Sequence, residues 1–187
     1  PIGWTSVWDA IWVTANEVTA QTSGQTRRAI ILLSDGDDTL RRVSRDEAVE
    51  AAVKANTIVY SIGIEPDCHG TDMACKLDKK ALRKVSEATG GRAFFPLDDE
   101  QLAAAFAEIN QELRTQYLVA YSPTNKARDN TYRRIRIEIA NPRLRDQKIK
   151  LTYREGYFAA PPRAAAPRRE RAPQERLKRP PRRPKKR

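Results

Sequence analysis

The sequence has very little histidine, cysteine and methionine, and this scarcity narrows the chemistry open to it. Its 187 residues include one histidine, two cysteines and one methionine. The histidine falls in a polar loop, and there is neither a Gly-x-Ser-x-Gly nucleophile motif nor a glycine-rich phosphate loop. We therefore expect a protein that is not an enzyme.

Long hydrophobic runs are also lacking. No apolar run approaches the roughly 20 residues that a membrane-spanning helix needs, so we expect no transmembrane segment. The sequence begins without methionine and without a signal-peptide pattern, and Pro1-Ile2-Gly3-Trp4 looks like the middle of a fold. We expect the chain to be an N-terminally truncated piece of a longer protein.

Acidic residues are scarce only toward the C-terminus. The chain has 35 Lys and Arg against 24 Asp and Glu, a net charge of +11, and residues 161–187 alone hold twelve basic and two acidic residues. This Pro-, Ala- and Arg-rich segment has almost nothing to bury, so residues 159–187 are predicted to form a disordered basic tail. The tail could bind nucleic acid or an anionic surface through phosphate contacts, or it could be a solvated linker.

The most informative stretch is an apolar strand that ends in a hydroxyl and three carboxylates. Residues 29–33 are unbroken Ala, Ile and Leu, which is typical of a parallel strand buried on both faces. Ser34, Asp35, Asp37 and Asp38 follow. In such sheets the chemistry lies just past the carboxyl ends of the strands, where Asp35 falls. A carboxylate there suits a hard cation or a cationic ligand, although Asp-Gly is also ordinary turn chemistry.

The rest of the first 115 residues alternates between helical and strand patterns. Apolar residues from Val7 to Val18 recur at helical spacing, and Ser44-Arg45-Asp46-Glu47 is a capping box that starts a second helix. A β-branched strand at 57–64 completes a βαβ unit, so residues 30–34 and 57–64 should be adjacent parallel strands. Three more elements are predicted: a helix near 79–88 that ends at Gly90-Gly91, a short strand at 92–95 and a helix at about 99–114.

After Thr115 the apolar period changes from helical to two. Strands are predicted at 117–121, 135–139 and 149–153, joined by polar turns as an antiparallel meander with one buried face. The predicted fold class is therefore α/β: a doubly wound, mostly parallel sheet, followed by a small antiparallel β meander and a disordered tail. The corresponding divisions of the chain are residues 1–115, 116–158 and 159–187.

The order of several motifs resembles the von Willebrand factor A (VWFA) family. These are Gly3-Trp4-Thr5 before a helix, a buried strand ending in Ser34-Asp35-Gly36, and the strand ending Ile62-Gly63-Ile64. Four stretches are also similar to a bacterial branch best known from acidobacteria: residues 5–11, 32–39, 89–95 and 112–117. The resemblance covers about residues 3–158. It implies a Rossmann-like VWFA fold with its first strand or strands missing, and a partial VWFA domain at 1–115.

The resemblance also implies a function and a site. Family members bind proteins through a metal-ion-dependent adhesion site, where two serines of an Asp-x-Ser-x-Ser loop, one threonine and one aspartate hold Mg²⁺ directly or through water. An acidic residue of the partner completes the octahedron. Thr5 matches the threonine and Asp35 the aspartate, but no Asp-x-Ser-x-Ser occurs in this sequence. The implied protein is a secreted or periplasmic, cation-dependent binding module whose intact parent holds Mg²⁺ or another divalent cation, while this fragment binds it weakly or not at all.

Other interpretations of the same residues remain open. Thr5 by itself would be a helix N-cap, and Asp37 and Asp38 would be solvated loop residues. Cys68 and Cys75, with His69 between them, could form a local disulfide if the protein is exported, remain free thiols, or begin a zinc site that lacks a fourth ligand. The alternative function is an electrostatic binder of nucleic acid or anionic surfaces through the basic tail.

Overall fold

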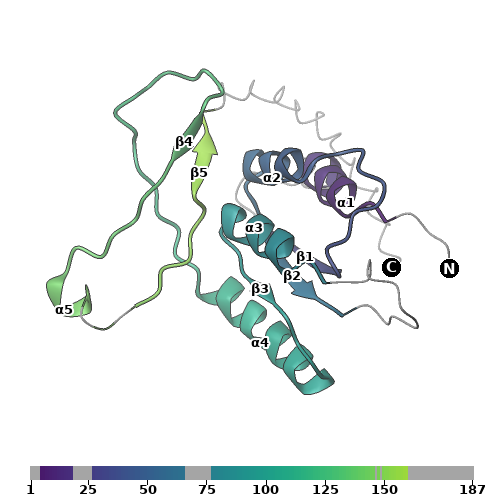
Figure 1. Ribbon diagram of the computed structural model, residues 1–187. Helices are drawn as coiled ribbons and strands as arrows, with labels where there is room; N and C mark the ends of the chain where they lie inside the picture. The colour runs from purple at the N-terminus through teal and green to yellow at the C-terminus, as the bar shows by residue number, and fades with distance from the viewer. Residues whose placement is uncertain (1–4, 19–26, 66–76, 146, 148, 160–187) are drawn as a thin grey trace, which may run out of the picture.

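The computed structural model describes residues 5–18, 27–65, 77–145, 147 and 149–159 (Figure 1). The loop with Cys68, His69 and Cys75, for which a disulfide was one prediction, lies outside the described residues. So do Gly3, Trp4 and residues 160–187 of the predicted tail. No helix within the described ranges is long and apolar enough to span a bilayer.

Three parallel strands form the main sheet. Strand β1 (Arg28–Ser34) pairs with β2 (Thr57–Gly63), which pairs with the short β3 (Ala93–Phe94). The predicted parallel pairing of residues 30–34 and 57–64 is confirmed. The strand order β1-β2-β3 leaves β1 at an edge of the sheet as far as the described residues extend.

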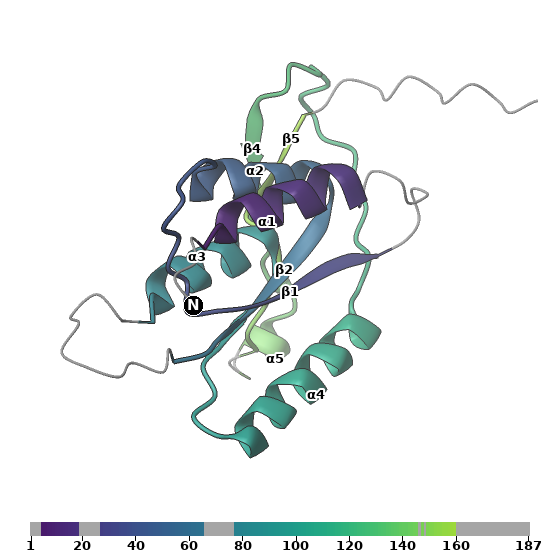
Figure 2. The ribbon, with the colours of Figure 1, turned by 90° about the vertical axis from the view of Figure 1, so that its right-hand side faces the viewer.

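Helices cover both faces of this sheet (Figure 2). On one face lie α1 (Val7–Val13) with its π-helical continuation η1 (Thr14–Val18), α2 (Arg45–Lys54) and α3 (Lys79–Thr89). On the other face lies α4 (Asp99–Thr115). Successive side chains of a strand point to opposite faces of the sheet, so β2 contributes to a hydrophobic core on each face. Val59 packs with the first set of helices, and Tyr60 and Ile62 pack with Ile109 of α4. The predicted α/β class, with a parallel sheet between helices, is confirmed.

Local signals fix the ends of two helices as predicted. The Ser44 hydroxyl accepts a hydrogen bond from the Glu47 N–H at 3.2 Å, and the Glu47 carboxylate accepts one from the Ser44 N–H at 2.8 Å, which completes the capping box of α2. Helix α3 ends at Gly90, whose φ of +87° is the left-handed conformation that glycine adopts without strain.

Residues 116–158 are called the arm below, and the sheet with helices α1–α4 is called the body. One end of the arm lies beside α2, where the centroid of the Phe158 ring is 4.9 Å from the Lys54 Nζ, and the other end projects away from the body (Figure 1). Strand β4 (Tyr132–Arg134) pairs antiparallel with β5 (Gly156–Phe158), and the one-turn helix α5 (Pro142–Arg145) lies at the outer end. The antiparallel sheet therefore has two strands, not the predicted three.

The prediction of a strand at 117–121 is wrong. The segments at 135–139 and 149–153 do not form strands either. Only the hydrogen bond from the Ile135 N–H to the Glu155 carbonyl, 2.8 Å long, continues the ladder toward them. An alternating apolar pattern needs a surface to bury one face. Much of the apolar surface of these segments stays open to solvent: Tyr117 is 95% exposed, and Ile137, Ile149 and Leu151 are 40–45% exposed.

Candidate functional site

The loop that follows β1 is fastened to the start of α1. The Thr5 N–H donates to the Thr39 hydroxyl oxygen at 2.8 Å. The Thr5 carbonyl accepts hydrogen bonds from the N–H groups of Thr39 and Leu40, each 3.1 Å long. These bonds join the segments that carry Thr5 and Asp35, although about 30 residues separate them in the sequence.

The backbone of the loop orients the carboxylate of Asp35. Its Oδ1 accepts a hydrogen bond from the Asp37 N–H at 3.1 Å and one from the Ser34 hydroxyl at 3.4 Å. The Asp35 carbonyl accepts a hydrogen bond from the Asp78 N–H at 2.8 Å, which ties the loop to the segment before α3. Asp35 is half-buried in this turn, so its position is set by the loop itself.

Asp38 is a buried carboxylate, and the prediction that it is solvated is wrong. Its exposure is 8%, and its Oδ1 accepts a hydrogen bond from the Val7 N–H at 3.1 Å. The residue at the N-cap position of α1 is Ser6, not Thr5, and its side chain makes no capping bond, so Asp38 satisfies this helix end instead. Burial raises the pKa of Asp38, the Val7 hydrogen bond opposes that shift, and the Asp9 charge adds to it.

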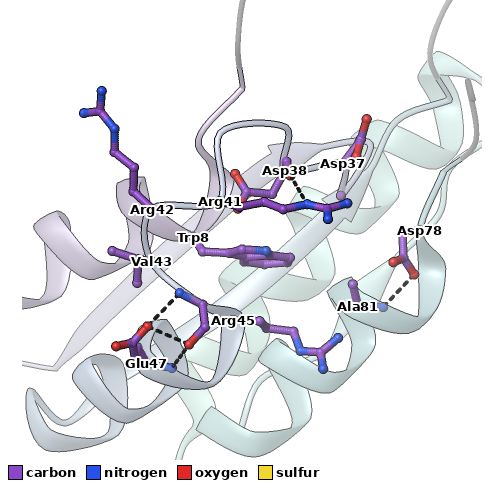
Figure 3. Close-up of a pocket in the computed structure, with 12 residues that line it drawn as sticks. Trp8, Asp37, Asp38, Arg41, Arg42, Val43, Arg45, Glu47, Asp78 and Ala81 are labelled. Carbon is purple, nitrogen blue, oxygen red and sulfur yellow. Dashed lines mark hydrogen bonds between the residues drawn. The ribbon is translucent and has the colours of Figure 1, made fainter.

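A cleft of about 450 Å³ opens beside this loop, between α1, α2 and the start of α3 (Figure 3). Trp8, only 7% exposed, forms part of the core and lines this cleft together with Arg41 and Arg45. Three of the four cleft carboxylates, Asp38, Asp78 and Glu47, accept hydrogen bonds from backbone N–H groups at helix starts. These carboxylates therefore have structural roles as helix caps.

The oxygen donors of this region fit a hard cation only in part. Mg²⁺ prefers oxygen ligands in near-octahedral geometry, and a threonine hydroxyl and an aspartate carboxylate are ligands of that type. Two such donors do not fill an octahedron. Within the described ranges, moreover, no group of three or more His, Cys, Asp and Glu residues could hold a metal ion. Thr5 and Asp35 therefore do not by themselves make up a metal site.

The fold and this loop define an α/β protein whose polar side chains gather at the carboxyl end of a parallel strand. The chain matches no protein-family model and no curated protein sequence. It is similar to a solved structure described as an uncharacterised membrane-spanning protein from Vibrio fischeri. The identity is 27%, the TM-score is 0.39, and the match covers 46% of this chain and 47% of the other.

Two further solved structures come from Bacteroides. A conserved hypothetical protein BatB from Bacteroides thetaiotaomicron is 20% identical, with a TM-score of 0.40 and coverage of 57% of this chain and 60% of that one. An aerotolerance-related membrane protein from Bacteroides fragilis, which carries multiple mutations to serine, is 18% identical with a TM-score of 0.40, over 57% and 59%. The chain thus spans less than two thirds of each of these proteins.

Proposed function

We propose that this chain is part of a cation-dependent protein-binding module of the VWFA type, with a binding rather than a catalytic role. The observation that carries the proposal is the pair of hydrogen bonds between Thr5 and Thr39. These bonds join the two segments whose residues match the family's metal ligands. Thr5 and Asp35 would hold Mg²⁺ directly or through water, and a carboxylate of the partner would complete its shell. A secreted or periplasmic location, which the resemblance implies, belongs to the same proposal.

The remaining ligands, in this proposal, come from a further strand that pairs with the open edge of β1. An unbroken Ile and Leu sequence is typical of an interior strand. Yet Ile31 and Leu33, on the α4 side of the sheet, are 40% and 47% exposed. A parallel neighbour would cover both side chains, and its carboxyl end would lie beside Asp35, where additional hydroxyl ligands could reach the ion.

Manganese titration of this chain, followed by NMR, tests the Thr5 and Asp35 ligands. Mn²⁺ accepts the same oxygen ligands as Mg²⁺ and broadens the signals of nearby nuclei even when binding is weak. We expect broadening centred on residues 5–7 and 34–39, and its loss in Asp35→Asn and in Thr5→Ala. Asp37→Asn is the matched control, because Asp37 is an exposed carboxylate in the same loop. Broadening that persists in Asp35→Asn would refute the assignment. No broadening at all would mean that binding depends on the ligands of the further strand.

A further inference from the structure

The arm carries a charge opposite to that of the body. Residues 1–115 contain 18 Asp and Glu against 13 Lys and Arg, a net charge of −5. Residues 116–158 contain ten Lys and Arg against four Asp and Glu, a net charge of +6. The basic character of this protein therefore extends well beyond its C-terminal tail, into a segment whose structure is described.

Aliphatic side chains gather toward the outer end of the arm. A shallow groove of about 390 Å³ there is lined by Ile137, Ile139, Ile149 and Leu151, and by Glu138, whose carboxylate pairs with Arg136 at 2.7 Å. Arg145 also lines it and donates from Nε to the Ile139 carbonyl at 2.6 Å, which fixes α5 against this groove. Ile137, Ile149 and Leu151 are 40–45% exposed, so the aliphatic surface is open to solvent.

Cations without carboxylate partners adjoin this surface. Arg143 and Lys150 are exposed and form no ion pair with another described residue. Leu144, in α5 beside Arg143, is itself 38% exposed. Aliphatic side chains flanked by free cations are typical of surfaces that lie at the headgroup level of an anionic bilayer. Single-stranded nucleic acid is instead held by aromatic side chains on which bases stack, and residues 134–151 contain no aromatic residue.

We propose that the outer end of the arm docks onto an anionic phospholipid surface. The exposed aliphatic side chains enter the boundary between headgroups and acyl chains, while Arg143 and Lys150 contact lipid phosphates. This surface lies on a different part of the chain from Thr5 and Asp35, so it does not depend on the proposed cation site. The twelve basic residues of 161–187 would add electrostatic attraction with almost no apolar contribution.

The charge contribution is tested by sedimentation of the full 187-residue chain with vesicles of phosphatidylglycerol, compared with phosphatidylcholine. We expect binding to the anionic vesicles alone. Because each cation near such a surface contributes about fivefold, Arg143→Gln with Lys150→Gln should weaken binding about 25-fold. Lys80→Gln with Arg114→Gln, two exposed residues of the body, gives the same net charge and should bind like the parent. Equal effects of the two pairs would overturn the proposal, because the total charge would then suffice.

The apolar contribution needs a separate variant. Leu144→Ser with Ile149→Ser should weaken vesicle binding about tenfold, since less apolar surface enters the bilayer. Leu97→Ser, at a 75% exposed position of the body, should have no effect. Two results would contradict the arm as a lipid surface. One is tighter binding of a single-stranded oligonucleotide than of the vesicles, with this binding lost in the same variants. The other is a dimer, seen by light scattering, that these substitutions abolish.

Discussion

Asp38 joins two parts of the chain that lie 31 residues apart in the sequence. Burial of an ionised carboxylate is unfavourable, but the first N–H groups of α1 need acceptors and carry the positive end of the helix dipole. The hydrogen bond from the Val7 N–H therefore compensates part of the burial cost. The Asp38 side chain and the hydrogen bonds between Thr5 and Thr39 together hold the start of α1 against the loop that carries Asp35.

Replacement of Asp38 by alanine should lower the free energy of unfolding by about 1–2 kcal/mol, because the cap of α1 is lost. Asp38→Asn keeps an oxygen acceptor and should be more stable than Asp38→Ala. Urea denaturation at pH 7 measures both. Asp37→Ala, at the exposed neighbouring position, should change the unfolding free energy by less than about 0.5 kcal/mol. An Asp38→Ala protein as stable as the parent would contradict the capping role.

The pH dependence of the same group has a definite sign. Its pKa in the folded protein is raised above the usual 3.8, so the protonated form favours folding. The stabilisation is complete below pH 3.8 and is lost as the pH rises through the raised pKa. Asp38→Asn should remove this part of the pH profile, which denaturation at a series of pH values would show.

At the scale of elements, a polar group around Tyr60 fixes the C-terminal end of α4 to the sheet. Tyr60 of β2 is 1% exposed, and its hydroxyl oxygen accepts a hydrogen bond from the Gln116 side chain at 3.4 Å. Arg92, just before β3, pairs with Glu108 at 3.1 Å and with Glu112 on the same helix. Burial, with a smaller contribution from the Glu112 charge, raises the pKa of Tyr60 to about 12.

This raised pKa predicts alkaline loosening of the α4 contact. The neutral phenol contributes stability that is complete below pH 10 and is lost as the pH rises toward 12. Tyr60→Phe cannot ionise, so its unfolding free energy should fall less than that of the parent between pH 10 and 12, by on the order of 2 kcal/mol. Tyr117→Phe, at a 95% exposed position, is the matched control and should follow the parent. Parallel pH profiles for Tyr60→Phe and the parent would show that this phenol does not couple folding to pH.

At the scale of the whole molecule, the sheet is covered unevenly. Helix α4 covers Tyr60 and Ile62 almost completely, whereas Ile31 and Leu33, which lie opposite them in the β1–β2 register, are 40% and 47% exposed. An edge strand with exposed apolar side chains presents unpaired backbone N–H and C=O groups and a hydrophobic surface to other molecules. The isolated chain should therefore self-associate through β1.

Leu33→Lys should reduce this self-association, because a lysine on an edge strand opposes the addition of another strand. Light scattering at increasing protein concentration measures the effect, and the substituted protein should remain monomeric to higher concentration. Leu97→Lys adds the same charge at a 75% exposed position in a loop and should associate like the parent. If both substitutions reduce association equally, net charge and not the β1 edge is responsible.

The sequence by itself determined the elements whose signals are local. The capping box at Ser44, the left-handed glycine at Gly90 and the apolar run of β1 each depend on a few neighbouring residues, so they predicted α2, α3 and the parallel pair of strands. The role of Thr5 as a metal ligand follows from the family resemblance alone, whereas Asp35 is also indicated by its position after a buried strand. The structure joins the segments that carry them.

Only the tertiary structure decided the features that depend on a distant contact. Asp37 and Asp38 are chemically identical neighbours, and only the arrival of the Val7 N–H makes one of them a buried cap. The segment 117–121 is an apolar run with residues typical of a strand, but strands need partners for their backbone groups and a surface for their apolar side chains. Such partners are set by the packing of whole elements, which no stretch of neighbouring residues encodes.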